Sequence, residues 1–102
     1  MARWVRVART DEVPAGEGRY FEVEGEPIAV FHVDGQYYAI SDICTHEEAS
    51  LAEGDLDGEI VECALHGARF NVRTGAVVAP PAVVPVRTYP VRIIDGQIEI
   101  EL

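Results

Sequence analysis

The sequence predicts an all-β protein built from antiparallel strands. Short apolar runs with a period of two fill most of its 102 residues, and helical periodicity is scarce. Asp-Gly pairs separate three pairs of these runs. Both central positions of a two-residue hairpin turn need positive φ, which Asp and Gly tolerate, so each pair predicts a tight hairpin. The three pairs are Asp34-Gly35, Asp57-Gly58 and Asp95-Gly96.

The predicted strands follow in order along the chain. They are residues 4–8, 19–23, 28–33 and 36–40, the short runs at 56 and 59–61, and residues 91–94 and 97–102. The run 28–33 is apolar on both faces, which predicts a well-buried strand. The stretches 41–54 and 63–74 lack a strand pattern and are predicted to be loops. Prolines cannot donate to a β-ladder, so the stretch 77–85, with Pro80, Pro81 and Pro85, is expected to leave the sheet as a stiff, extended lid.

The length suits one domain over residues 1–102, and the charge argues against several partners. The chain has 18 acidic residues against 8 arginines and no lysine, a net charge of -10. Nucleic acids and anionic membranes attract basic faces, so neither is expected as a partner. No apolar run reaches the length of about 18 residues that spans a bilayer, and no signal-type segment opens the chain, so we expect a cytoplasmic location. An acidic surface permits a partner with a basic docking face.

Both cysteines and two of the three histidines lie in the two predicted loops. One loop contains Cys44-Thr45-His46 and the other Cys63-Ala64-Leu65-His66-Gly67, with 16 residues between His46 and Cys63. The hairpin between them would bring the loops side by side. Two matched Cys/His pairs favour a metal site over a buried structural role or a disulfide between the cysteines. Two thiolates and two imidazoles suit either tetrahedral zinc or a two-iron, two-sulfur cluster, and composition leaves both open.

Residues 44–75 resemble the Rieske family, whose motif is Cys-x-His followed by Cys-x-x-His-Gly. The rest of the chain is similar to the small ferredoxins of bacterial ring-hydroxylating (aromatic) dioxygenase systems, notably at 56–58 and 89–92. The resemblance implies one [2Fe-2S] cluster. It implies a small cluster-binding subdomain, about residues 42–82, on a larger β base, with the segment around Pro80-Pro81 covering the cluster. The implied ligands are the cysteines on the inner iron and the histidines on the outer iron near the surface: Cys44, Cys63, His46 and His66.

The same resemblance implies an electron-transfer component rather than an enzyme. The chain would carry single electrons from an NAD(P)H-dependent flavoprotein ferredoxin reductase to a terminal ring-hydroxylating oxygenase, through small transient complexes. A mononuclear oxygenase iron needs two histidines and a carboxylate, and His32, which we expect to be structural, is the one histidine left. The alternative is a small Rieske-like subunit of a nitrite reductase or of another multi-subunit oxidoreductase.

The resemblance also implies a low reduction potential. Rieske potentials span roughly -150 to +300 mV and are tuned by hydrogen bonds to the sulfurs. High-potential members have a disulfide near the cluster, and a serine and a tyrosine whose hydroxyls donate toward it. Without these donors the reduced, more negative cluster is less stabilised. The corresponding positions here are Ala49 and Leu65 for the disulfide, and Ala68 and Phe70 for the hydroxyls.

Overall fold

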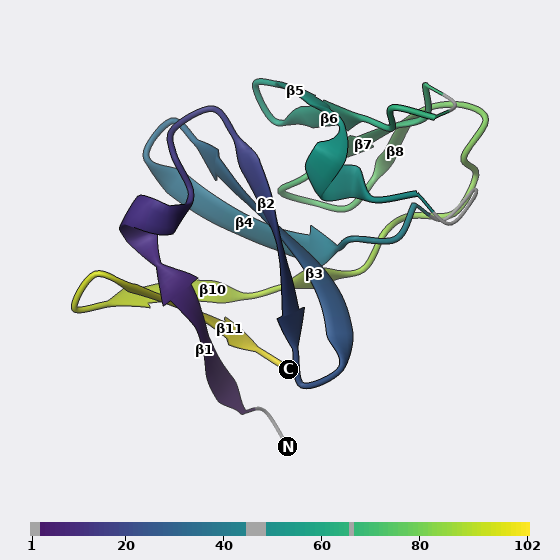
Figure 1. Cartoon of the computed structure of the whole chain (residues 1–102). Helices are drawn as coiled ribbons and strands as arrows, with labels where there is room; N and C mark the ends of the chain where they lie inside the picture. The colour runs from purple at the N-terminus through teal and green to yellow at the C-terminus, as the bar shows by residue number, and fades with distance from the viewer. Residues whose placement is uncertain (1–2, 45–48, 66) are drawn as a thin grey trace.

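The computed structural model describes residues 3–44, 49–65 and 67–102. This part of the chain forms eleven β-strands and two one-turn 3-10 helices, and the strands make three antiparallel sheets (Figure 1). The all-β prediction is therefore confirmed. Across the same residues, no helix has the length and hydropathy to cross a membrane.

Two of the sheets form a base. The first has the order β1 (Trp4–Arg9), β11 (Gln97–Glu101), β10 (Val91–Ile94). The second has the order β2 (Gly18–Val23), β3 (Glu26–Val33), β4 (Gln36–Ser41), β9 (Thr88–Tyr89), and the short helix η1 (Thr10–Glu12) follows β1. Side chains of both sheets, together with Val13 directly after η1, share one apolar cluster, which we call the base core: Val13, Val23, Ile28, Val30, Ala39, Tyr89, Ile98 and Ile100.

The third sheet has the order β5 (Asp55–Asp57), β6 (Ile60–Glu62), β7 (Arg69–Asn71), β8 (Val77–Ala79) and is preceded by η2 (Leu51–Glu53). Two loop predictions are wrong here. The stretch 63–74 contains β7, whose three residues are too few for a strand pattern to show. The stretch 77–85 begins with β8, because the prolines start only at Pro80 and the residues before it can still pair along the edge of the sheet.

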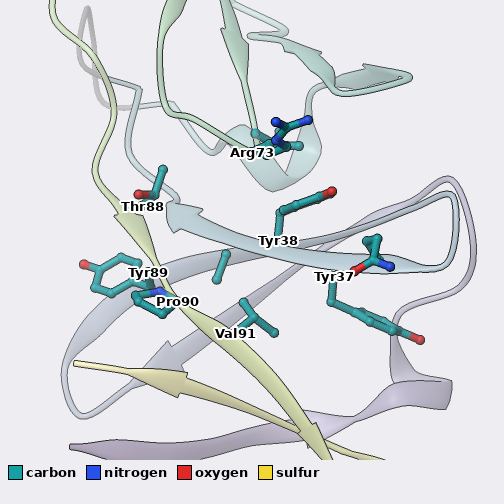
Figure 2. A pocket seen from close by; sticks show the side chains of 10 residues that line it. Tyr37, Tyr38, Arg73, Thr88, Tyr89, Pro90 and Val91 are labelled. Carbon is teal, nitrogen blue, oxygen red and sulfur yellow. The ribbon is translucent and has the colours of Figure 1, made fainter. Parts of the chain in front are cut away.

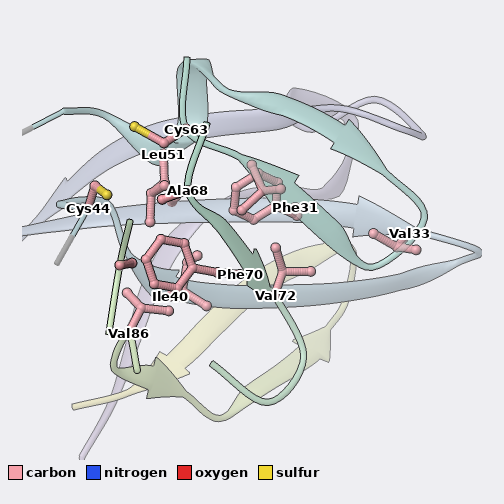
Figure 3. Packing of buried hydrophobic residues seen from close by; sticks show 13 residues of the cluster. Phe31, Val33, Ile40, Cys44, Leu51, Cys63, Ala68, Phe70, Val72 and Val86 are labelled. Carbon is pink, nitrogen blue, oxygen red and sulfur yellow. The ribbon is translucent and has the colours of Figure 1, made fainter. Parts of the chain in front are cut away.

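A second apolar cluster, which we call the inter-sheet core, joins the third sheet to the base (Figure 3). Its buried members are Ala29, Phe31, Val33, Ile40, Cys44, Leu51, Val61, Cys63, Ala68, Phe70, Val72, Ala82 and Val86. Strand β3 contributes to both cores, because alternate side chains point to opposite faces. Ile28 and Val30 belong to the base core, whereas Ala29 and Phe31 belong to the inter-sheet core. All four are fully buried, as the two-faced apolar run predicts.

Two of the predicted Asp-Gly hairpins are confirmed. Asp34-Gly35 joins β3 to β4 with φ of 50° and 79°, and Asp95-Gly96 joins β10 to β11 with φ of 50° and 74°. A further hairpin of this kind, Glu24-Gly25 between β2 and β3, was not predicted as such. Its glutamate lies at a positive φ of 51°, a conformation for which sequence rules favour Asn, Asp or Gly.

The third predicted turn is wrong by one residue. Asp57 pairs with Ile60, so the two-residue loop between β5 and β6 is Gly58-Glu59 rather than Asp57-Gly58. This register places Leu56 opposite Val61, and both pack in or against the inter-sheet core. A slip of one residue would turn one of these apolar side chains to the opposite face, so burial decides the register.

Candidate metal centre

Cys44 lies at the mouth of a short loop that follows β4. The Cys44 N–H donates to the Ala49 carbonyl over 3.0 Å, and Ile43 and Ser50 form an isolated antiparallel bridge one residue further out. We call residues 44–49 the Cys44 loop. The predicted ligand His46 lies outside the described residues, as do its neighbours Thr45, Glu47 and Glu48.

Cys63 lies at the mouth of a matching loop between β6 and β7. The Cys63 N–H donates to the Ala68 carbonyl over 2.7 Å, and the Gly67 N–H donates to the Cys63 carbonyl over 2.9 Å. Gly67 has a φ of 75°, which glycine adopts without a steric penalty. We call residues 63–68 the Cys63 loop; the predicted ligand His66 lies outside the described residues. In both loops the cysteine N–H thus bonds to the carbonyl five residues later.

Both cysteines belong to the inter-sheet core. They are 2% and 1% exposed, and Figure 3 shows them at the same end of this core, beside Leu51 and Ala68. Both are free thiols, so the disulfide considered from the sequence is not formed. The nearest described ends of the two loops, Ala49 and Cys63, are 14 residues apart along the chain. The two loops nevertheless place their cysteine sulfurs in one buried, apolar region.

These donors fit an iron–sulfur cluster. Thiolates are the soft ligands that select such clusters, and a buried thiolate needs a positive partner, which the irons supply. Among residues 3–44, 49–65 and 67–102, no three His, Cys, Asp or Glu side chains gather in a way that could hold a metal ion. The ligand set expected from the sequence needs both His46 and His66 in addition to the two described thiols.

The positions at which high-potential Rieske proteins have a hydroxyl donor are occupied by apolar side chains in this protein. Ala68 and Phe70 are fully buried in the inter-sheet core, and the Ala68 carbonyl is already bonded to the Cys63 N–H. The third histidine is structural, as expected. His32 Nδ1 lies 2.9 Å from the Val13 carbonyl, and its ring stacks on Tyr37 with centroids 4.2 Å apart.

Sequence reasoning missed Asp42, the one buried charged side chain among the described residues. Its Oδ1 accepts hydrogen bonds from the Ser50 hydroxyl over 2.9 Å and from the Ala52 N–H over 2.8 Å. An acid at the end of a strand, eight residues before a serine, is too common a pattern to signal such a contact in advance.

A groove of about 320 Å³ lies elsewhere, between β4, the strands β9 and β10, and the turn that carries Arg73 (Figure 2). Tyrosine rings and aliphatic groups line it, among them Tyr37, Tyr38 and Val91. None of its described lining residues is a cysteine or a histidine, so the groove offers no ligands for the cluster.

Comparison with known proteins assigns the family. The Rieske [2Fe-2S] domain matches residues 3–90. The biphenyl dioxygenase ferredoxin subunit of Pseudomonas sp. (strain KKS102) is 46% identical over 91 residues, which cover 88% of this chain and 84% of that protein. Ferredoxin CarAc of Metapseudomonas resinovorans is 42% identical over 96 residues, covering 93% of this chain and 90% of that one.

Solved structures agree with this assignment. The ferredoxin of carbazole 1,9a-dioxygenase from Nocardioides aromaticivorans IC177 superposes with a TM-score of 0.91 at 41% identity, covering 95% of each chain. A chain in a complex of reduced oxygenase and oxidized ferredoxin in carbazole 1,9a-dioxygenase superposes with a TM-score of 0.90 at 39% identity, covering 95% of this chain and 91% of that one. A nitrite reductase small subunit, matched at 24% identity with a TM-score of 0.80, shares the fold. The motif resemblance is thus confirmed: this chain belongs to the Rieske [2Fe-2S] family, and its cofactor is a Rieske-type cluster.

Proposed function

We propose that this chain is a one-electron carrier that takes electrons from a flavoprotein ferredoxin reductase, fed by NAD(P)H, and passes them to a terminal ring-hydroxylating oxygenase. The observation that carries the proposal is the pair of matched loops, which present two free, buried thiols to one region. The support for the partner class is the set of relatives, which are ferredoxin components of dioxygenase systems. The acidic composition supports a protein that binds neither nucleic acid nor an anionic membrane surface, and we expect it to act in the cytoplasm.

We assign four ligands to the cluster: Cys44, His46, Cys63 and His66. The cluster-binding subdomain is then about residues 42–82, which include β5 to β8 and both ligand loops. When bound, the cluster supplies a site for a single electron at a low potential. The chain's own residues hold the two thiols at fixed places through the backbone bonds to Ala49 and Ala68, and the apolar side chains of the inter-sheet core keep water away from them.

The described surface beside the ligand loops suits a small docking interface. Leu65 of the Cys63 loop is 60% exposed, and a hollow of about 350 Å³ lies between the two loops. Its described lining residues are Ala49, Ser50, Glu53, Ala64 and Leu65. Exposed aliphatic side chains around an electron-transfer centre favour close, short-lived contact, as in transient redox complexes.

The charged side chains on and around the third sheet indicate which kind of partner surface would bind. Arg69 of β7 and Arg73 of the turn that follows are both engaged in ion pairs, Arg69 with Glu62 and Arg73 with Glu59. Three exposed carboxylates at and next to β5 have no ion-pair partner among the described residues: Glu53, Asp55 and Asp57. We therefore expect the oxygenase and the reductase to present basic residues around an apolar spot, because complementary fields speed encounter.

The first experiment is spectroscopic. The purified protein should be red-brown, contain two irons per chain, and show a rhombic EPR signal after reduction with dithionite. His46→Gln and His66→Gln should each lose this signal, while the matched control His32→Gln, which alters the structural histidine, should keep it. A colourless, zinc-loaded protein, or an unchanged signal in a His46 or His66 variant, would overturn the assignment.

The second experiment tests the direction of electron flow. The chain should support turnover when combined with a purified dioxygenase ferredoxin reductase and a terminal oxygenase, and Cys44→Ser should abolish it. The alternative, a nitrite reductase small subunit, rests on a likeness that shows the fold alone. Coupling to a nitrite reductase catalytic subunit but to no ring-hydroxylating oxygenase would reverse the choice.

A further inference from the structure

We propose that Asp42 is a positioning residue for the cluster, because its buried carboxylate closes the base of the Cys44 loop. Asp42 is 2% exposed, and it follows directly on the last residue of β4. The proposal rests on the assignment of Cys44 as a ligand, which lies two residues further along.

The bonds of Asp42 join the two ends of the loop region. Its Oδ1 receives the Ser50 hydroxyl and the Ala52 N–H, and its main-chain carbonyl receives the Leu51 N–H over 2.7 Å. One residue therefore bonds to three consecutive residues on the far side of the loop. Seven residues lie between Asp42 and Ser50, and they include both predicted ligands of this loop, Cys44 and His46.

Asp42 also fixes this closure to the base. Its N–H donates to the Pro27 carbonyl over 2.9 Å, at the start of β3, and the neighbouring Ser41 N–H donates to the Arg87 carbonyl. Leu51, which the closure holds in place, is fully buried in the inter-sheet core beside the thiols. Main-chain bonds of residues 41 and 42 thus tie the base of the Cys44 loop to the sheets, and the Asp42 side chain closes the loop by bonding to Ser50 and Ala52.

A carboxylate is suited to this task, because one oxygen can accept two hydrogen bonds at once and no water is needed to bridge them. Loss of the side chain would leave the Ala52 N–H and the Ser50 hydroxyl without their acceptor in a protected place. The loop ends would then separate more easily, and the ligands would be held less firmly. Residues that orient metal ligands from behind typically change metal retention by about 10- to 100-fold when they are removed.

The test compares Asp42→Ala, Asp42→Asn and Ser50→Ala in the cluster-loaded protein. Asparagine keeps an Oδ1 acceptor, whereas alanine removes it. We expect Asp42→Ala to lose its cluster absorbance at least about tenfold faster in the presence of a chelator and to show a broadened EPR signal after reduction. Asp42→Asn should stay close to wild type. Ser50→Ala, which removes one of the two bonds, should fall between them, and it supplies the answer if Asp42→Ala fails to fold.

Asn71→Ala is the matched control. Asn71 Oδ1 also accepts two local bonds, from the Arg73 and Thr74 N–H groups, but it does so in the turn between β7 and β8, at the end of β7 opposite to the Cys63 loop. The Asn71 side chain belongs neither to the inter-sheet core nor to the bond between Gly75 and Val86. Asn71→Ala should therefore lower the unfolding temperature yet keep the wild-type cluster lifetime and EPR line shape. The proposal fails if Asn71→Ala loses the cluster as fast as Asp42→Ala, or if Asp42→Asn behaves like Asp42→Ala. A wild-type protein without a Rieske spectrum would instead refute the proposed function.

Discussion

Gly75 holds the segment that connects β8 to β9. It lies between β7 and β8 with a φ of 79°, and its carbonyl accepts the Val86 N–H over 2.9 Å. A Cβ at this position would lie 2.3 Å from the Val86 carbonyl oxygen and 3.0 Å from Thr88 Cγ2. Alanine would therefore force the backbone around residue 86 away from the turn and weaken the contact that anchors the proline-rich segment 80–85.

Two costs add up in Gly75→Ala. An alanine in the left-handed region costs about 1–2 kcal/mol. Displacing the Val86 backbone leaves protected hydrogen-bonding groups unsatisfied, which costs about 1–3 kcal/mol more. Gly96→Ala isolates the first cost, because Gly96 has a φ of 74° and nothing within 4 Å of its Cβ position. The two variants should thus differ by about 1–3 kcal/mol in unfolding free energy.

The assay is thermal unfolding of the cluster-loaded wild type and of both variants, followed by far-ultraviolet circular dichroism at one scan rate. For a domain of this size, 1 kcal/mol corresponds to about 4–8 °C, so Gly75→Ala should unfold at least about 4 °C below Gly96→Ala. Bleaching of the visible absorbance should also be faster in Gly75→Ala alone, because the segment that it loosens packs Ala82 and Val86 into the core that contains the thiols. Equal unfolding temperatures for the two variants would refute the steric reasoning.

Three further predictions concern potential, salt and pH. Ala68→Ser and Phe70→Tyr add hydroxyls in the apolar core that contains the two thiols. A hydrogen bond that favours the reduced cluster by about 1 kcal/mol raises a one-electron potential by about 40 mV, so voltammetry that shows no change in either variant would contradict this account. Stopped-flow measurements should show slower electron transfer to the oxygenase as the ionic strength rises from about 0.01 to 1 M, because the Debye length falls from about 30 to about 3 Å. A rate that increases with salt would exclude attraction by the acidic surface. Burial raises the pKa of Tyr89 above its usual value, against the opposing effect of the Arg87 cation. The fold therefore favours the neutral form of the Tyr89 hydroxyl. The stability that this preference provides is complete below the unfolded-state pKa of 10.0 and is lost as pH rises through the folded pKa. The free energy of unfolding should thus fall less in alkali for Tyr89→Phe than for the wild type.

Much of the base was predictable because its signals are local. A turn such as Asp34-Gly35 needs positive φ at two adjacent residues, and the pair of residue types that satisfies this need is visible in the sequence. The two-faced burial of β3 was also predictable, because an apolar run without alternation has no polar face to give to water. Neither inference depends on which strands lie next to each other.

The third sheet was less predictable because its strands are too short to carry a pattern. β7 and β8 have three residues each, and their pairing follows from packing of Phe70 and Val77 at the inter-sheet core. The register of β5 and β6 was misjudged for a related reason. The Asp-Gly preference is worth less than burying Leu56 together with Val61, and only the assembled core shows that competition.

The sequence identifies the candidate ligands more easily than the residues that hold the ligand loop in place. Few residue types bind iron, so Cys44 and Cys63 stand out by their chemistry even in an unaligned sequence. Asp42 and Ser50 act through hydrogen bonds that many residue pairs can make, and their partnership exists only because the chain folds back on itself. The support for a ligand loop is therefore harder to read than the ligands themselves.

The place of the thiols ties the cluster to the integrity of the fold. Cys44 and Cys63 pack in the same apolar core as Phe31, which belongs to the base, and Phe70, which belongs to the third sheet. A charged thiolate in such surroundings is unfavourable unless a cation neutralises it, so the core is most stable when the irons are bound. The third sheet can leave the base only by exposing this core, which would also open the ligand loops. Cluster retention and the packing of the two halves are thus two aspects of one equilibrium, and substitutions far from the ligands act on the cluster in proportion to how far they open that core.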